Sequence, residues 1–256
     1  MKIQFKINKE YLLTHSLGQI GITPFPEWVN FLNKLWKKNE ELSCLLQGRP
    51  HLIFINNATK KTYKFNANFN NFIKYALKTK EYNKLYLQTE KYLNFIKNQW
   101  YKNETAVYNF LEQTLGLKLP PAKKINILIT HPSFKNGFAY TQHDSIGWGH
   151  KEEWKNYSTV YITHEILHIL TKKFNGDQEI MHAIIELACD NELRIQLNKR
   201  GVYFKEGNQK IGHPSLYKIE RKILPAWKKF LYQKDNKVSV ISFSLKQDKK
   251  LKKLKQ

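Results

Sequence analysis

The chain has 256 residues, of which 25% are charged and 41% hydrophobic, a balance typical of a folded globular protein. It has no apolar run of about 18 residues, and its first residues lack the apolar core of a signal peptide, so we expect neither a membrane span nor a secretory leader. Cys44 and Cys189 lie far apart in apolar contexts, which favours reduced thiols and a cytoplasmic protein.

The formal net charge of +22 is large. Such a surface attracts nucleic acid, acidic membranes or acidic substrates without specificity. Lysine greatly outnumbers arginine, and the lysines are spread along the whole chain rather than gathered in one segment. Binding of nucleic acid or of an acidic surface is therefore an alternative hypothesis and not the first one.

The N-terminal region, residues 1–117, is predicted to be α+β and largely helical. Residues 1–8 alternate like a strand, and residues 51–55 and 61–65 flank a turn-rich stretch typical of a hairpin. A helix is expected to begin near Thr23, and residues 69–117 follow a helical pattern that ends at Gly116. Core side chains at helical spacing in the first of these helices are Trp28, Phe31, Leu32, Leu35 and Trp36.

A second region, residues 118–235, begins at the Leu119-Pro120-Pro121 boundary. Residues 125–130 read as a buried strand and residues 136–141 as a loop followed by a short strand. His143, Asp144 and His150 follow in a Gly-rich loop, where a second metal site is conceivable but solvated loop residues are commoner. A last helix is expected over residues 214–232, and residues 236–256 are expected to form a basic tail, disordered or weakly helical.

The second region is organised around His164-Glu165-Ile166-Leu167-His168, which matches the zinc-hydrolase pattern H-E-x-x-H. On a helix, residues four apart lie on one face, so both imidazoles can reach one ion. Glu165 is placed to activate a zinc-bound water. Apolar residues surround the motif almost completely, which indicates a buried helix whose polar groups need a partner. Two histidines satisfied inside a core remain the simpler alternative.

A second helix is predicted over residues 179–193, after a turn at residues 175–177. His182, Glu186 and Asp190 recur every four residues along one face of it. Seventeen residues separate His168 from Glu186. A catalytic zinc takes three protein ligands and keeps one position open, so this helix is the expected source of the third ligand.

The pattern H-E-x-x-H followed by E-x-x-x-D resembles the gluzincin group of zinc metallopeptidases, which includes thermolysin and the zinc aminopeptidases. The resemblance covers about residues 124–194 and rests on His164, Glu165, His168, Glu186 and Asp190. It implies a mostly helical, zincin-like α+β fold with a small sheet beside the motif helix. It also implies that His164, His168 and Glu186 bind Zn²⁺, and that Asp190 accepts the free ring N–H of a ligand histidine, His164 first.

Two other sets of residues bear on this site. The three-histidine pattern H-E-x-x-H-x-x-G-x-x-H fails, because Thr171 and Phe174 stand where its glycine and last histidine belong; His182 remains the alternative third ligand. In gluzincins a tyrosine or histidine C-terminal to the third ligand stabilises the oxyanion. His213 is our first choice for that role, and Tyr217 and Tyr203 are the alternatives.

These features predict a zinc-dependent metallopeptidase whose Glu165 acts as general base and whose substrate is a peptide or protein. In gluzincins an edge strand upstream of the metal helix pairs with the substrate backbone, and residues 136–141 occupy a similar place in the sequence. Two alternatives stay open: a zincin-like binding or assembly protein with weak or no turnover, and a basic nucleic-acid-binding protein with structural histidines.

Overall fold

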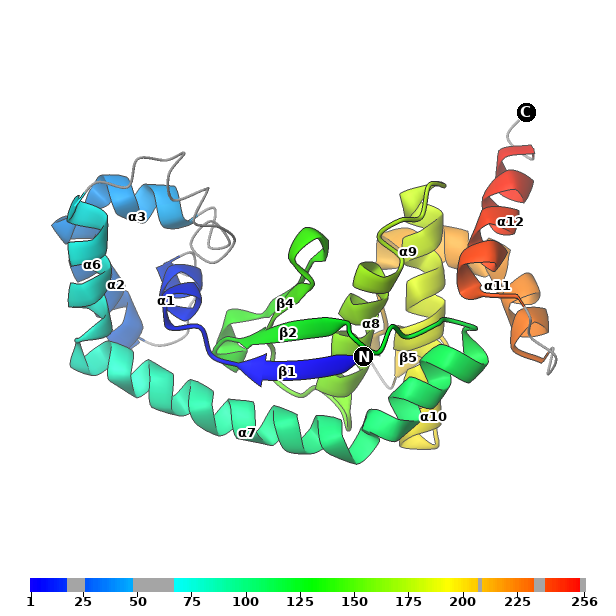
Figure 1. Ribbon diagram of the computed structural model, residues 1–256, viewed down its shortest axis with the longest axis horizontal. Helices are drawn as coiled ribbons and strands as arrows, with labels where there is room; N and C mark the ends of the chain where they lie inside the picture. The colour runs from blue at the N-terminus through cyan, green and yellow to red at the C-terminus, as the bar shows by residue number, and fades with distance from the viewer. Residues whose placement is uncertain (18–25, 48–66, 207–208, 233–237, 254–256) are drawn as a thin grey trace. The chain divides into compact units, whose positions relative to one another are not determined.

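A computed structural model describes residues 1–17, 26–47, 67–206, 209–232 and 238–253 of the chain (Figure 1). The chain forms two compact units. Unit 1 comprises residues 1–2, 98–125 and 152–256, and unit 2 comprises residues 3–97 and 126–151. The hairpin predicted at residues 51–65 and the helix start predicted at Thr23 lie outside the described residues.

Unit 2 consists of helices and a four-stranded mixed sheet. Its helices are α1 (Lys9–Leu17), α2 (Pro26–Lys38), α3 (Glu40–Gln47), α6 (Ala67–Leu77) and the first part of α7 (Lys80–Asn109). The sheet has the order β1-β2-β4-β3, in which β2 and β4 are parallel and β3 and β4 are antiparallel. Its strands are β1 (Lys2–Lys6), β2 (Lys124–Ile129), β3 (Asn136–Tyr140) and β4 (Ser145–Gly149).

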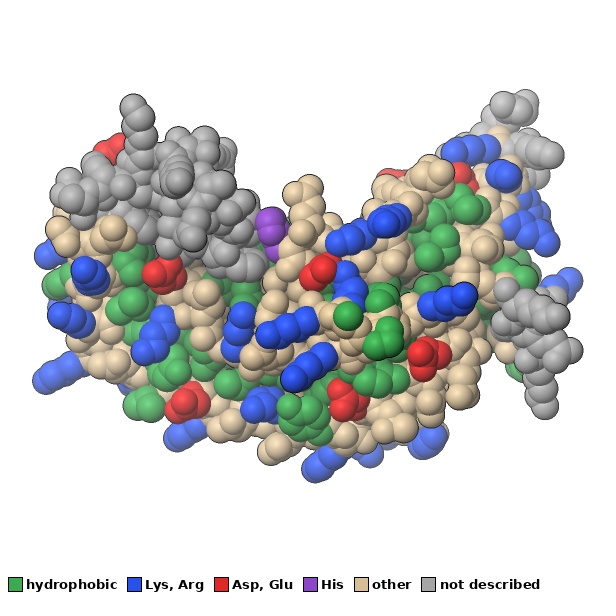
Figure 2. All heavy atoms as spheres, viewed as in Figure 1, with side chains coloured by type: hydrophobic (Ala, Val, Ile, Leu, Met, Phe, Trp, Pro, Cys, Tyr) green, Lys and Arg blue, Asp and Glu red, His purple; other side chains and the backbone are tan. Residues whose placement is uncertain are grey.

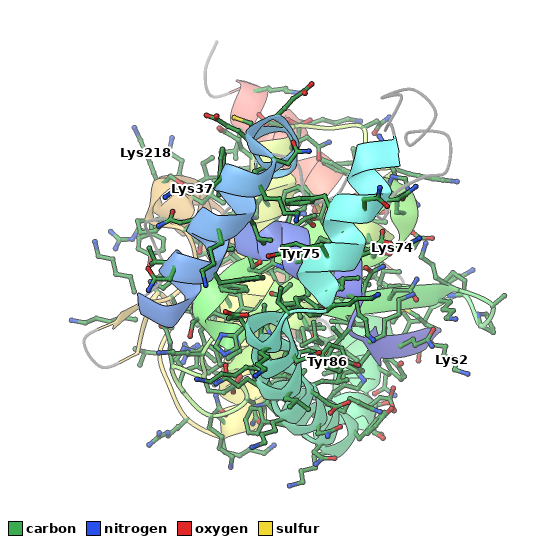
Figure 3. The ribbon with its side chains drawn as sticks, turned by 90° about the vertical axis from the view of Figure 1, so that its left-hand side faces the viewer. Lys2, Lys37, Lys74, Tyr75, Tyr86 and Lys218 are labelled. Carbon is green, nitrogen blue, oxygen red and sulfur yellow. The ribbon has the colours of Figure 1, made fainter. Side chains whose placement is uncertain are left out.

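The core of unit 2 forms where the apolar stripes of these helices meet, as their helical spacing predicts. Its buried members are Leu12, Leu13, Phe31, Leu32, Leu35, Phe72, Ile73, Ala76, Tyr82, Leu85 and Phe134. Lysines cover the outer faces: Lys37 on α2 and Lys74 on α6 point away from the core in Figure 3. The Lys38 ammonium lies 3.8 Å from the centroid of the Tyr75 ring, an exposed cation–π contact.

The strands predicted from alternation and from the apolar run are present. In β1 the burial alternates between Ile3 and Phe5 on one side and exposed lysines and glutamine on the other. In β2 the side chains of Ile125, Ile127, Leu128 and Ile129 are buried. Strand β3 closes the sheet at one edge, as expected for residues 136–141, and Phe138 on it is 57% exposed.

Unit 1 is almost entirely helical. Besides the end of α7, it contains η1 (Phe110–Thr114), α8 (Tyr157–Leu170), α9 (Gln178–Glu186), η4 (Leu187–Leu193), α10 (Arg194–Asn198), η5 (Pro214–Leu216), α11 (Tyr217–Tyr232) and α12 (Val240–Lys253). A two-stranded ladder joins β5 (Lys205–Glu206) to β6 (Gln209–Lys210). The whole is therefore an α+β protein in which helix predominates.

Neither unit is a single continuous segment of the chain. The boundary expected after residue 117 falls inside unit 1, because residues 98–125 belong with residues 152–256, while residues 126–151 belong to unit 2. The sequence predicted a domain boundary at Pro120 and Pro121, where the backbone forms a turn. A proline pair marks a turn, but it does not determine which segments pack together afterwards.

The C-terminal segment is also more ordered than the predicted basic tail. Residues 240–253 form α12, and the apolar side of this helix is buried while its lysines face outward. The Phe243 ring lies 4.8 Å from that of Phe230 and 5.9 Å from that of Trp227, both on α11 (ring centroids). This segment is therefore an amphipathic helix, which its high lysine content made hard to predict from the sequence.

Candidate metal centre

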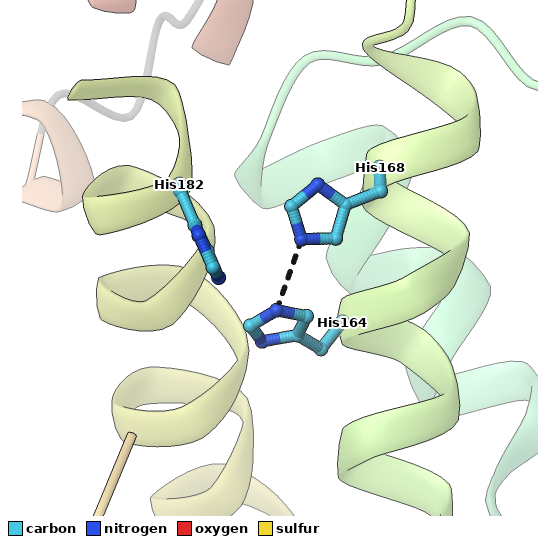
Figure 4. A group of neighbouring side chains, drawn as sticks. All are labelled: His164, His168 and His182. Atoms are coloured by element: carbon cyan, nitrogen blue, oxygen red, sulfur yellow. Dashed lines mark hydrogen bonds between the residues drawn. The ribbon is translucent and has the colours of Figure 1, made fainter. Parts of the chain in front are cut away.

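Helix α8 presents the two motif histidines side by side, because they are one turn apart on a helix whose other faces are packed (Figure 4). The Nε2 atoms of His164 and His168 are 3.1 Å apart. Two nitrogen ligands on one tetrahedral zinc ion, each at about 2.1 Å, lie roughly 3.4 Å apart. The pair is thus spaced as two neighbouring ligands of one ion would be.

The first turn of α8 is held by side chains from outside the helix. Asn156 occupies the N-cap position, with φ of 63° and no capping side chain. Instead, the main-chain N–H of Ser158 donates to Glu152 (3.1 Å) and that of Thr159 to Gln99 (2.9 Å). Two otherwise unpaired donors are thereby satisfied, which fixes the start of the motif helix.

Asp190 orients the first histidine. Its Oδ1 lies 2.8 Å from Nδ1 of His164, and both side chains are buried. A carboxylate on Nδ1 fixes the tautomer and leaves Nε2 to face the cluster. This is the contact that the gluzincin resemblance implied for Asp190.

A π-helical turn, η4, carries Asp190. The Nδ2 of Asn191 donates to the carbonyl of Glu186 (3.0 Å), and Nε of the fully buried Arg194 donates to the carbonyl of Asp190 (2.8 Å). Arg194 also donates to the carbonyl of Val202 (2.6 Å), which ties the following loop to this turn. Such wide turns are frequent at functional sites, because they re-aim one side chain within a helix.

Glu186 is fully buried and is held by His213. The main-chain N–H of His213 donates to Oε2 of Glu186 at 2.8 Å, and the His213 Nδ1 forms a short hydrogen bond with Oε1. Gly212 makes this approach possible: its φ is +74°, and an added Cβ would collide with the Glu186 carboxylate. The sequence therefore needs glycine before His213.

His182 lies between the two parts of the cluster. Its ring centroid is 4.8 Å from that of His168, 5.4 Å from that of His164 and 5.1 Å from that of His213. Its Nε2 is buried and has no hydrogen-bond partner within the described part of the chain; a carboxylate oxygen of Glu186 is 3.6 Å away. A buried ring nitrogen that is not engaged in a hydrogen bond is available to bind a cation.

Two groups of possible ligands result, and each brings its atoms within 4.8 Å of one another. The first is His164, His168 and His182; the second is His182, Glu186 and His213. Glu186, the predicted third ligand, thus belongs to the second group, whereas His182, the alternative, belongs to both. Imidazole nitrogens with a carboxylate are donors that suit zinc, so the residues fit the expected ion.

Burial and the surrounding carboxylates set the charges of these rings. Burial opposes charging of His164, but Asp190, Glu165 and Glu186 outweigh it and raise the pKa of His164 to about 9. Burial, followed by the neighbouring histidines, lowers the pKa of His168 to about 3. Burial likewise lowers the pKa of His182 to about 4. His168 and His182 are therefore neutral near pH 7, the state in which an imidazole binds a metal, whereas His164 is charged at that pH and would release its Nε2 proton on binding a metal.

The three candidate oxyanion donors, His213, Tyr217 and Tyr203, differ in their contacts. His213 borders the cluster, with its side chain 60% exposed. The Tyr217 hydroxyl donates to the carbonyl of Ile211 (2.7 Å), and the Tyr203 hydroxyl donates to Glu192 and accepts from Trp227. Both tyrosines hold the C-terminal loops in place, and His213 alone of the three contacts Glu186.

Sequence reading missed two groups at the site. Tyr161, one turn before Glu165, has its ring centroid 6.2 Å from that of His164 and bonds to the backbone of Gly212. Glu220 on α11 is fully buried, and burial together with the charge of Glu186 raises its pKa to about 9. The only indication in the sequence that Glu220 is buried is that it lies four residues after Leu216, which is itself buried.

The Gly-rich loop does not join this centre. Among the described residues, neither group of possible metal ligands includes His143, Asp144 or His150. The Nδ1 of His150 lies 2.9 Å from the carbonyl of Lys151, an exposed local contact.

Lysines and arginines are scattered over the face shown in Figure 2. None of the described helices has the length and apolarity that crossing a bilayer requires.

The chain has no match among known proteins: no family model, no curated protein and no solved structure matches it.

Proposed function

We propose that this protein is a zinc-dependent metallopeptidase that hydrolyses peptide bonds. The observation that carries the proposal is the pair of Nε2 atoms of His164 and His168, 3.1 Å apart, with Asp190 on the opposite nitrogen of His164. A histidine that binds a metal typically donates its other ring N–H to a carboxylate, and Asp190 occupies that position against His164.

His164 and His168 would bind the ion through Nε2. The geometry favours His182 as the third ligand, because one of its ring nitrogens lies within 4.8 Å of a ring nitrogen of both His164 and His168, whereas Glu186 is engaged by His213. Glu186, implied by the resemblance, is the competing third ligand. A bound zinc ion would polarise the scissile carbonyl and lower the pKa of a water molecule to about 7.

Glu165 follows His164 directly and is half-buried at the edge of the cluster. Its negative charge helps to raise the pKa of the neighbouring His164 ring. In the proposed reaction this carboxylate takes a proton from the attacking water and passes it to the leaving nitrogen.

His213 is the residue proposed to steady the developing negative charge. Its Nδ1 is bonded to Glu186, and this hydrogen bond, against the effect of burial, raises the pKa of His213. A ring that keeps its proton can donate from its remaining nitrogen to an oxyanion. The exposed side of the ring leaves room for a substrate.

The test is peptide-library cleavage by tag-free protein of measured zinc content, with and without a chelator. We expect cleavage that the chelator abolishes and that added zinc restores. Bound zinc without any cleavage would instead indicate a zincin-like binding protein. Protein that binds no zinc and cleaves nothing would leave a basic helical protein with structural histidines, and the proposal would be wrong.

A further inference from the structure

Unit 1 has a cavity of about 600 Å³ away from the candidate metal ligands, none of which is among the described residues that line it. Three segments of the chain form its walls: residues 116–123 after η1, residues 169–173 at the end of α8, and residues 239–242 at the start of α12. Cavities that bind small molecules commonly have volumes of roughly 300–1,000 Å³. This cavity is therefore large enough for a small organic ligand.

The start of α12 is fixed against the chain that follows η1. The main-chain N–H of Val240 donates to the carbonyl of Leu115 at 2.8 Å. Gly116, with φ of +62°, allows this close approach, because an added Cβ would lie 3.1 Å from Cα of Ser239. The wall formed by these two segments is thus a built part of the fold.

Positive charge is gathered around this cavity. Four lysines line it: Lys118, Lys123, Lys172 and Lys173. The described residues that line it include no aspartate and no glutamate. Like charges around one cavity repel one another, and an anion bound between them would remove that repulsion.

The N-terminal end of α12 adds to this positive potential. A helix start carries roughly half a unit of positive charge, and α12 is 14 residues long. Ser239 and Ser242 at this end both line the cavity, and their hydroxyl oxygens are 3.3 Å apart, so either can donate to an anion. The end of α8 bears the opposite partial charge, but the four lysines outweigh it.

The rest of the wall is aliphatic. Leu117, Ile169, Leu170 and Ile241 line it, and the described lining residues include no Phe, Tyr or Trp. Single-stranded nucleic acid is typically held by stacking on aromatic rings, so the cavity suits a small ligand better than a nucleic-acid strand. Those residues also include no arginine, the residue that pairs with carboxylates through two bonds, whereas lysine binds phosphate as a point charge.

We propose that this cavity binds a small organic phosphate that carries several negative charges. The four lysines and the start of α12 surround the phosphate groups, and the aliphatic wall contacts the organic part. A phosphate ester free in solution and the headgroup of a phospholipid share this chemistry. The inference does not depend on the proposed peptidase function, because it uses none of the candidate zinc ligands.

Calorimetric titration of tag-free protein with inorganic tripolyphosphate tests the proposal. We expect one equivalent to bind, with a Kd that rises at least about tenfold in Lys172→Gln/Lys173→Gln, because two charges beside the anion are lost. Lys34→Gln/Lys37→Gln is the matched control, since it removes the same charge from exposed positions on α2 and should bind as the wild type does. The neutral chelator 1,10-phenanthroline is present throughout, so that phosphate bound to a zinc ion is not counted.

Ser242→Glu provides a variant whose effect a folding defect cannot imitate. A glutamate three residues after Ser239 completes a capping box, which stabilises a helix start, while its charge repels an anion in the cavity. We expect a Tm at least as high as that of the wild type and a Kd for tripolyphosphate raised at least about tenfold. Ser242→Gln adds similar bulk without the charge and should weaken binding far less.

Several results would overturn the proposal. Wild-type protein that does not bind tripolyphosphate has no such site. Equal weakening by the two lysine pairs would reduce binding to the overall charge of the chain. A single-stranded oligonucleotide that displaces tripolyphosphate and binds more tightly through Lys172 and Lys173 would make nucleic acid the ligand.

A vesicle experiment separates the two sources of phosphate. If the protein floats with phosphatidylcholine vesicles that contain phosphatidic acid, and Lys172→Gln/Lys173→Gln does not, the ligand is a lipid headgroup. If tripolyphosphate binds and neither protein floats with these vesicles, the ligand is a phosphate ester free in solution. Both results support the cavity as a phosphate site.

Discussion

Asp190 Oδ1 lies 2.8 Å from Nδ1 of His164, and both groups are buried. This contact joins the π-helical turn η4 to the motif helix α8, and it decides which nitrogen of His164 faces the cluster. The position of the ring thus depends on a residue 26 positions along the chain.

Asp190→Asn should lower zinc affinity by about 10- to 100-fold, because the amide keeps the shape but loses the charge that makes His164 a stronger ligand. Chelator competition measures the Kd. Asp177→Asn is the matched control, since Asp177 caps α9 through a bond to the N–H of Glu179 and asparagine caps equally well. Equal affinity in Asp190→Asn and wild type would remove Asp190 from the site.

Glu165→Gln should keep zinc and lower kcat/KM for peptide cleavage by about 10²- to 10⁴-fold, because the amide cannot take a proton from water. His168→Ala should lose both zinc and cleavage. Zinc content and cleavage rate are measured on the same preparations. If Glu165→Gln cleaves peptides at the wild-type rate, Glu165 is not the general base.

The third ligand is decided by comparing His182→Ala with Glu186→Ala. We expect His182→Ala to weaken zinc binding by more than about 100-fold, since loss of a direct ligand exceeds the loss of an outer partner. Glu186→Ala should leave zinc bound. The reverse result would give Glu186 the role that the gluzincin resemblance implies.

Gly212→Ala should destabilise the protein by about 1–3 kcal/mol, because φ is +74° at this position and the added Cβ would displace the Glu186 carboxylate. Thermal or urea unfolding measures the change. Gly137→Ala is a control, because its Cβ would meet only the Trp148 ring, at 3.2 Å. A Gly212→Ala protein as stable as the wild type would show that the loop can open without cost.

Acid should destabilise unit 2 through two histidines that contact Phe134. Burial lowers the pKa of His15 to about 4; burial and then Lys151 lower that of His131 to about 4. Between pH 4 and about 6.5 the unfolded chain binds protons that the folded rings do not, so the free energy of unfolding falls as the pH falls.

Within that range, each of these histidines should lower the free energy of unfolding by about 1.4 kcal/mol for every unit by which the pH falls. His15→Phe keeps a ring beside Phe134 and should make the loss between pH 6.5 and 4.5 smaller than in wild type. Urea unfolding at several pH values measures it. An identical pH dependence in both proteins would mean that His15 is not held neutral by burial.

Local periodicity was enough to predict much of the fold. The alternation of residues 1–8, the apolar run at residues 125–130 and the helical spacing around His164 each report a single element and the face it buries. Asp177 as a helix cap and Gly116, with φ of +62°, as a helix end were also predictable, because caps depend on neighbouring residues.

The grouping of segments was not predictable in this way. Residues 98–125 join residues 152–256 across an intervening segment that belongs to unit 2, and α12 is held by Phe230 and Trp227 of α11. Such packing depends on long-range burial, which leaves no local pattern. The same holds for Glu220 on α11, because the charge that acts on it belongs to Glu186, a residue on another helix.

Helical spacing in the sequence places His164, Glu165 and His168 on one helix and puts Glu186 and Asp190 on one face of the next, because such spacing is a local property. How these groups pair depends on tertiary packing. It set Asp190 against His164, drew Glu186 to His213 and left His182 unpaired among the other rings. Distances between side chains on different helices depend on how the helices pack, and that packing is fixed by the whole core of the unit.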